Sequence, residues 1–208
     1  MKLIKQLFVL AALLFATHTF AAAMNHDYKL VQPAQPTHSG NKVEVLEFFF
    51  YGCSHCYNLH PLLSEWEKKM PRDVTLEYVP TIFNPSWEPM ANTYYALELM
   101  GKHKQLHDPL FTAWNVNNTD LGDLAKISAF VAKNGVDSKA FADNYQSFSV
   151  QTKVMRSKQM TQSYALRGTP TIVVDGKYLI TGLQPADTIK VLNDLVEMAR
   201  KERHSGKQ

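Results

Sequence analysis

Both cysteines of this 208-residue chain lie in one tetrapeptide, Cys53-Ser54-His55-Cys56. The tetrapeptide stands where an apolar run, Val45 to Tyr51, gives way to a helical pattern. Two thiols two residues apart at the start of a helix can form a disulfide and open it again, whereas a bond that closes so small a loop adds little stability. The sequence therefore predicts a strand followed directly by a helix, with thiol-disulfide exchange at their junction.

The first 23 residues have the features of a secretory signal peptide. Lys2 and Lys5 precede the apolar run Leu7 to Ala16, and small residues follow it. This run is shorter than the roughly 20 residues that a membrane-spanning helix needs, so we expect cleavage after Ala21 or Ala23 and a soluble mature protein. Loss of the two lysines lowers the formal net charge from +3 to about +1, and we do not expect nucleic acid as a partner.

Hydrophobic periodicity predicts a strand, a helix, a strand, a block of helices, a strand hairpin and a last helix. The first three elements are a strand from Val43 to Phe50, a helix that begins near Cys53, and a strand from Val74 to Tyr78. The block contains five predicted helices. The first runs from Met90 to a stop at Gly101, and the second from Leu106 to Trp114. The third is capped by Asp120 and ended by Asn134-Gly135, the fourth runs from Asp137 through Phe148, and the fifth from Val150 to Leu166. The hairpin strands Thr171 to Val174 and Lys177 to Thr181 flank Asp175-Gly176, and the last helix begins near Pro185.

Two motifs together resemble those of the DsbA family of thiol-disulfide oxidoreductases. They are the segment from Glu47 to Cys56, EFFFYGCSHC, and the segment from Arg167 to Thr171, RGTPT, before the predicted hairpin. The resemblance covers nearly the whole mature chain and implies an α/β protein, a thioredoxin fold with an inserted all-helical domain. Residues 24–82 and 159–208 would form the thioredoxin-like domain, and residues 83–158 would form the insertion.

The resemblance also implies a function. The enzyme would be a periplasmic monomer that donates the Cys53–Cys56 disulfide to unfolded exported proteins and is reoxidised by a membrane oxidase of the DsbB type. That disulfide would be its only redox group, with no cofactor and no metal ion. A reductase or isomerase of the same fold is one alternative, and a client-binding chaperone with incidental cysteines is another. A zinc module would need further ligands, and the chain has no second pair of cysteines.

The two cysteines have different predicted roles. A thiol exchanges only as its thiolate, and at a helix start Cys53 would face unpaired N–H groups and the positive end of the helix dipole. The dipole contributes about 1 kcal/mol, and roughly 30 mV corresponds to 1.4 kcal/mol, so we expect the Ser54 hydroxyl and the His55 ring to tune the redox potential as further donors. Cys53 should meet the client, whereas Cys56 lies on the apolar stripe of the helix and would resolve the mixed disulfide.

Glu47 and His60 are less constrained by the pattern. A carboxylate in a buried strand must be paired, hydrated or raised in pKa. By the resemblance Glu47 would lie beneath the cysteines and relay protons for Cys56; the alternative is a carboxylate that reaches solvent or a lysine. His60 stands where the family often has an acidic residue, and we expect a partly exposed surface histidine there, with a tuning role as the alternative. Ser54 replaces a proline that is common in the family.

Thr169-Pro170 is the last candidate site. Sequence alone favours a trans bond, because only about 5–6% of X-Pro bonds in folded proteins are cis. The resemblance implies instead a cis Pro170 beside Cys53, with the Thr169 backbone free to pair with an extended client. Threonine at this position also occurs in disulfide isomerases. Aromatic residues of the insertion could line a client groove, but helical spacing explains most of them as core: Phe83, Trp87, Tyr94, Tyr95 and Trp114.

Overall fold

The computed structural model describes residues 27–205, which form a five-stranded sheet with helices around it. The predicted signal peptide, residues 1–23, lies outside the described residues. The strands are β1 (Lys29–Leu30), β2 (Val43–Phe49), β3 (Val74–Pro80), β4 (Thr171–Val174) and β5 (Tyr178–Thr181), in the order β1-β5-β4-β2-β3. The helices are α2 (Ser54–Lys69), η1 (Pro85–Trp87), α3 (Glu88–Leu99), α4 (His103–Asn115), α5 (Leu124–Lys133), α6 (Ser138–Tyr145), α7 (Phe148–Ser163) and α8 (Pro185–Ser205).

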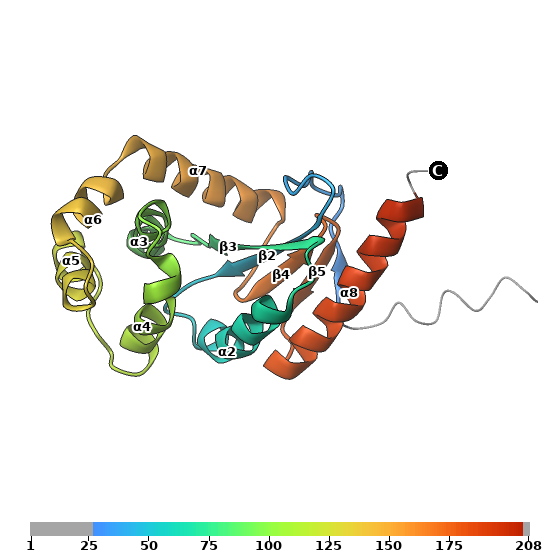
Figure 1. The fold of residues 1–208 in the computed structure, drawn as a ribbon, viewed down its shortest axis with the longest axis horizontal. Coiled ribbons are helices and arrows are strands. Elements are labelled where there is room, and N and C mark those ends of the chain that lie inside the picture. The colour runs from blue at the N-terminus through green and yellow to red at the C-terminus, as the bar shows by residue number, and fades with distance from the viewer. Residues whose placement is uncertain (1–26, 206–208) are drawn as a thin grey trace, which may run out of the picture.

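The sheet is covered on both faces, as the apolar run in β2 predicts. Helices α2 and α8 lie against one face, and the C-terminal part of α7 lies over the other (Figure 1). All seven residues of β2 are buried, with Val45 and Phe49 in the cluster that includes α2 and α8, and Leu46 and Phe48 in the cluster that includes Tyr164. β2 is parallel to β3 and antiparallel to β4. The site at the end of β2 therefore stands on a strand at the centre of the core.

Five α-helices, α3 to α7, lie between β3 and β4 in the chain and form a group beside the sheet (Figure 1). No strand interrupts this stretch within residues 27–205, as predicted. The expected domain boundary after Lys158 falls inside α7, which continues to Ser163. The buried Ser157 hydroxyl donates to the carbonyl of Pro80 at the end of β3. Helix α7 thus belongs to the insertion at its start and to the sheet at its end.

Two local predictions were wrong and one strand was missed. Asp123 caps α5, accepting from Lys126 N at 2.9 Å, whereas the predicted cap, Asp120, accepts from Gly122 N in the preceding turn. Phe148 begins α7 rather than ending α6, because Ser147 caps α7. Strand β1 was missed, since it has two residues, both exposed, and no apolar run.

The Asp175-Gly176 hairpin was predicted correctly and is tied to α8. Both residues have positive φ, 55° and 67°, as a tight hairpin turn requires. The Arg203 guanidinium, near the end of α8, donates through Nε to both carboxylate oxygens of the buried Asp175, at 2.9 and 3.0 Å. Arg203 also donates to the carbonyl of Gly40 at 2.9 Å. One guanidinium therefore joins α8, the hairpin and the loop before β2.

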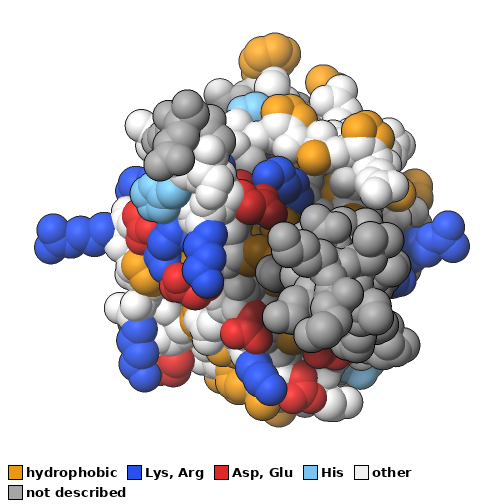
Figure 2. Space-filling view, turned by 90° about the vertical axis from the view of Figure 1, so that its right-hand side faces the viewer, with side chains coloured by type: hydrophobic (Ala, Val, Ile, Leu, Met, Phe, Trp, Pro, Cys, Tyr) orange, Lys and Arg blue, Asp and Glu red, His pale blue; other side chains and the backbone are white. Residues whose placement is uncertain are grey.

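The surface is of mixed charge. On the side of the molecule where α8 lies, Figure 2 shows Lys and Arg side chains next to Asp and Glu side chains, outside the part covered by residues that are not described. Ion pairs such as Arg200–Asp73 and Lys177–Glu202 belong to this pattern. In the described part of the chain, no helix combines the length and apolar character needed to cross a membrane.

Candidate active site at the start of α2

Cys53 lies at the junction that the sequence predicts. β2 ends at Phe49, a turn closes with Cys53 N donating to Phe50 O at 3.0 Å, and Cys53 is then the extended N-cap residue of α2. The thiol of Cys53 is partly exposed, whereas Cys56, one turn into the helix, is completely buried. Both thiols are free in this structure. The pair therefore presents one sulfur to a partner and keeps the other inside.

The surroundings of Cys53 favour its anion. A hydrogen bond from the Cys56 thiol lowers the pKa of Cys53 to about 5; partial burial opposes this, and the Thr169 side chain and the backbone N–H groups of Cys56 and His55 add to it. The backbone donors are unpaired groups of the first helical turn. At neutral pH the reduced enzyme thus carries a thiolate at Cys53.

Glu47 lies under the two cysteines and reaches neither solvent nor a lysine; its role as a proton relay stays a prediction. It is completely buried on β2, between Tyr78 of β3 and Ile172 of β4, and neither carboxyl oxygen has a hydrogen-bond partner among the described residues. Burial, and then the charges of Cys53 and Glu67, raise the pKa of Glu47 to about 8. Glu47 is therefore mostly protonated at neutral pH.

Cys56 is shifted in the direction opposite to Cys53. Burial raises its pKa far above the ordinary value, and its hydrogen bond to Cys53 and the charge of Glu47 act in the same direction. Two thiols two residues apart therefore have very different acidities, because one lies at the helix start and the other in the core.

The loop before β4 completes the front of the site. The Thr169–Pro170 bond is cis, as the resemblance implied. The Cys53 thiol donates to the Thr169 carbonyl at 3.2 Å, although 116 residues separate them. A cavity of about 240 Å³ adjoins this loop, and it is lined by residues of α2, the loop and the β5–α8 connection, including His55, Leu59, Pro170, Ile180 and Leu183.

Ser54 and His55 are exposed on the first turn of α2. Within residues 27–205 no hydrogen bond joins either side chain to Cys53; the helix contributes its backbone N–H groups instead. A tuning role for these two side chains stays a prediction. The described part of the chain holds no group of three or more His, Cys, Asp or Glu side chains that could hold a metal ion.

An aromatic cluster fixes the turn before Cys53, and the sequence pattern did not reveal it. The Phe50 ring stacks on Trp87 with centroids 3.9 Å apart, and Trp114 meets the same ring edge-on at 5.5 Å. A Cβ atom on Gly52 would lie 2.4 Å from Phe50 Cε1 and 2.6 Å from Trp114 Nε1. Only glycine fits there, because two aromatic side chains of the turn and the insertion close over the backbone.

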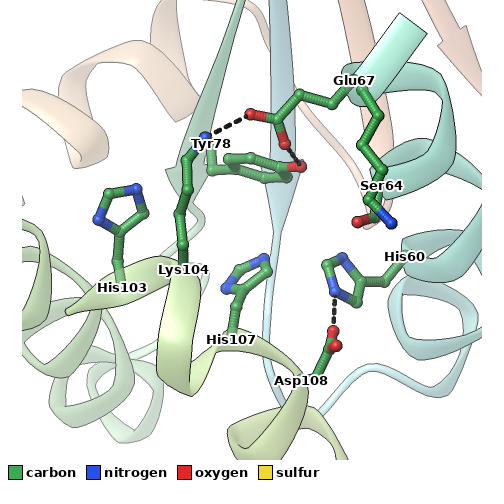
Figure 3. Close-up of a pocket in the computed structure, with 9 residues that line it drawn as sticks. His60, Ser64, Glu67, Tyr78, His103, Lys104, His107 and Asp108 are labelled. Carbon is green, nitrogen blue, oxygen red and sulfur yellow. Dashed lines mark hydrogen bonds and ion pairs between the residues drawn. The ribbon is translucent and has the colours of Figure 1, made fainter. Parts of the chain in front are cut away.

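A second polar region lies behind the cysteines, between α2, β3 and α4. It surrounds a cavity of about 390 Å³ lined by residues that include His60, Glu67, Tyr78, Lys104 and His107 (Figure 3). The prediction of a surface histidine at position 60 was wrong. His60 is 7% exposed, pairs through Nε2 with Asp108, and stacks on Phe111 with centroids 5.1 Å apart, because α4 packs over this part of α2.

The comparisons with known proteins agree with this geometry. The model of the DSBA-like thioredoxin domain matches residues 44–192. The chain belongs to this family. It is 36% identical over 199 residues to the thiol:disulfide interchange protein DsbA of Bordetella parapertussis, covering 92% of this chain and 95% of that one. It is 31% identical over 210 residues to the DsbA of Pseudomonas aeruginosa PAO1, covering 96% and 98%.

Solved structures of the family superpose on the fold. The crystal structure of Pseudomonas aeruginosa DsbA gives a TM-score of 0.81 at 31% identity, covering 88% of this chain and 95% of that one. The oxidoreductase DsbA of Xylella fastidiosa gives 0.80 at 28% identity, covering 85% and 96%. The chain is thus a DsbA-family thiol-disulfide oxidoreductase with a thioredoxin fold, and Cys53 and Cys56 are its only cysteines.

Proposed function

We propose that this chain is a periplasmic dithiol oxidase that passes its Cys53–Cys56 disulfide to unfolded exported proteins and is reoxidised by a membrane oxidase of the DsbB type. The observation that carries the proposal is the low pKa of Cys53, about 5, beside the raised pKa of Cys56. A stable thiolate in the reduced enzyme makes the disulfide a ready acceptor of electrons. The enzyme therefore tends to leave its disulfide in the client.

The exchange begins at the exposed sulfur. A client thiolate attacks Cys53 Sγ, the bond between the two cysteines breaks, and the electron pair passes to Cys56 Sγ. This sulfur is buried and holds its proton strongly, so it takes up a proton from the neighbouring Glu47 carboxyl. A second client thiolate then attacks the client sulfur, and Cys53 leaves as a stable thiolate. The client gains a disulfide, and the enzyme is reduced by the same two electrons.

The loop around Pro170 suits an extended client. Its Thr169 carbonyl already contacts Cys53, so a client strand that paired with this backbone would bring its own sulfur to the exposed side of the active site. The adjoining cavity between His55 and Leu183 would take client side chains. Client binding would then depend mainly on backbone contacts, which permits many different sequences.

Periplasmic location is supported by the signal-peptide features of residues 1–23 and by membership of the family. A monomer is sufficient for the proposed chemistry, because the described residues of one chain provide both cysteines, Glu47 and the Thr169–Pro170 loop. The disulfide itself would be the redox group, with no further cofactor.

Equilibration with glutathione, together with alkylation, tests the proposal. We expect a glutathione buffer to reduce the Cys53–Cys56 disulfide readily, and iodoacetamide to alkylate reduced Cys53 with a midpoint near pH 5. Cys56→Ser should accumulate a mixed disulfide with a reduced, unfolded client, and Cys53→Ser should accumulate none. A disulfide that opens only in strongly reducing buffer, with Cys53 unreactive below pH 7, would assign the chain to the reductases. Equal client binding by Cys53→Ser without any exchange would assign it to the chaperones.

A further inference from the structure

The polar cavity behind the cysteines contains buried nitrogen atoms that the exchange chemistry described so far does not use. His107 Nε2 and His60 Nδ1 have no hydrogen-bond partner in the described part of the chain, and the two residues are 6% and 7% exposed. Both residues line the cavity (Figure 3). A buried polar nitrogen of this kind is normally satisfied by water. The exposed Lys104 and Asp108 at its edge connect the cavity with solvent.

His107 also connects this cavity to the segment that carries Glu47. Its Nδ1 shares a hydrogen bond of 2.8 Å with the hydroxyl of Tyr51, and both side chains are buried. Glu47 lies between Val45 and Phe49 on one face of β2. The Tyr51 ring packs edge-on against Phe49, with centroids 5.1 Å apart, and belongs to the same buried cluster, so it lies on the Glu47 side of the sheet. The charge of Glu47 contributes to the raised pKa of Tyr51, which places the hydroxyl within its electrostatic reach.

The remaining hydroxyl near Glu47 is already engaged. Tyr78, the neighbour of Glu47 on β3, donates to Glu67 Oε2 at 2.9 Å, and Glu67 Oε1 accepts from Lys104 at 3.0 Å. Tyr51, in contrast, bonds to a neutral ring: burial, and then the neighbouring His60 and His103, lower the pKa of His107 well below its usual value. A neutral imidazole accepts at one nitrogen while it donates at the other, which is the property that a proton path needs.

We infer that Tyr51 and His107 form the path by which the Glu47 carboxyl exchanges protons with the polar cavity and hence with solvent. The inference rests on the proposed function, in which Glu47 gives a proton to Cys56 and takes it back. Among the described residues neither Tyr51 nor His107 hydrogen-bonds to a sulfur, so they are positioning residues for the proton and not catalytic residues. In this path one buried water would bridge the carboxyl and the hydroxyl, since neither Glu47 oxygen has a hydrogen-bond partner among the described residues.

The proton balance closes over one redox cycle. When the client reduces the enzyme, Glu47 has lost its proton to Cys56; water in the cavity protonates His107 Nε2, the Nδ1 proton passes to Tyr51, and the Tyr51 proton passes to Glu47. When the enzyme is reoxidised, the transfers first run in reverse: Glu47 gives its proton to Tyr51, Tyr51 gives its own to His107 Nδ1, and the Nε2 proton leaves to water in the cavity. The Glu47 carboxylate then takes the proton from Cys56 as the disulfide forms, which restores the starting state. His107 thus alternates between its two neutral tautomers. Reduction leaves its proton on Nε2 and reoxidation leaves its proton on Nδ1, so each half of the cycle restores the tautomer that the other half needs.

Rates of reduction by excess dithiothreitol test this path in the full chain. Trp114 lies against Gly52, next to Cys53, so we expect tryptophan emission to change with the state of the disulfide and to follow the reaction. We expect Tyr51→Phe and His107→Ala each to slow the reaction about tenfold, below the 10²–10⁴ that a positioned acid contributes. Imidazole should restore the rate of His107→Ala, because the adjoining cavity can admit it, but should not restore the rate of the double variant. The equilibrium with glutathione should stay at the wild-type value in all variants.

Matched variants separate a proton path from a packing defect. His103→Ala removes a histidine of the same cavity and helix, and Tyr78→Phe removes the other hydroxyl; both should react at the wild-type rate. A wild-type rate for Tyr51→Phe, which keeps the packed ring, overturns the inference, as does a loss that imidazole leaves unchanged in His107→Ala. The inference is also overturned if Tyr78→Phe reacts slowly while Tyr51→Phe and His107→Ala do not. Failure of the wild-type disulfide to exchange with any thiol would instead overturn the proposed function.

Discussion

Replacement of Glu47 by glutamine should remove the part of the pH dependence of stability that Glu47 causes in the reduced protein. The carboxyl is completely buried, has no hydrogen-bond partner among the described residues, and has its pKa raised to about 8. In the unfolded chain it would ionise with the ordinary pKa of 4.5. Between these two values the folded protein keeps a proton that the unfolded chain has lost, so the free energy of unfolding must fall as the pH rises.

The size of the effect follows from the two pKa values. From 4.5 to about 8 is about 3.5 pH units, and at 1.36 kcal/mol per unit the folded state loses up to about 5 kcal/mol across this window. Glu47→Gln has no proton to lose. The difference in free energy of unfolding between variant and wild type should therefore move by up to about 5 kcal/mol in favour of the variant between pH 4.5 and pH 8. At pH 4.5 only the cost of the buried amide remains.

Urea unfolding of both proteins under reducing conditions at several pH values measures this difference. Any constant cost of the buried amide cancels when two pH values are compared, and so does the titration of Cys53, which both proteins share. Parallel curves for wild type and variant between pH 4.5 and pH 8 would refute the reasoning, because they would mean that Glu47 ionises in the folded protein as easily as in water.

Three further substitutions probe other contacts of the fold and site. Thr169→Val removes a hydrogen bond that stabilises the Cys53 thiolate, so the pKa of Cys53 should rise above about 5 in alkylation profiles. Gly52→Ala places a Cβ 2.4 Å from an aromatic carbon and 2.6 Å from an indole nitrogen, and should lower the free energy of unfolding by about 1–3 kcal/mol. Arg203→Ala leaves the buried Asp175 without its charged partner and should cost about 3–5 kcal/mol, measured by urea unfolding.

Each of these has a matched control. Thr169→Ser keeps a hydroxyl and should keep the alkylation midpoint; a shift as large as that of Thr169→Val would contradict the assigned hydrogen bond. Arg200→Ala breaks a pair with the exposed Asp73 and should cost at most about 1 kcal/mol. Equal losses for the two arginine variants would show that burial of Asp175 is not what makes Arg203 important. A second glycine, Gly168, has open space at its Cβ position, so Gly168→Ala should not share the steric cost of Gly52→Ala.

Local sequence signals were sufficient for most of the secondary structure. The apolar run of β2, the apolar stripe of α2 and the Asp175-Gly176 turn each depend on neighbouring residues, and each was predicted within one or two residues of its place. The errors fall where local signals compete, as with Asp120 and Asp123, which both suit a helix cap. β1 carries almost no local signal, because its pairing with β5 alone defines it.

The sequence by itself determined the reactive pair and its asymmetry, since the spacing of Cys53 and Cys56 on a helix decides which sulfur is exposed. Only the tertiary structure decided what surrounds them. The contact of Tyr51 with His107 spans 56 residues, and His60 is buried because a helix from the insertion covers it. Helical and strand periods describe which face of an element is apolar. They do not describe which distant polar groups packing brings to the same cavity, and those groups set the acidities on which the chemistry depends.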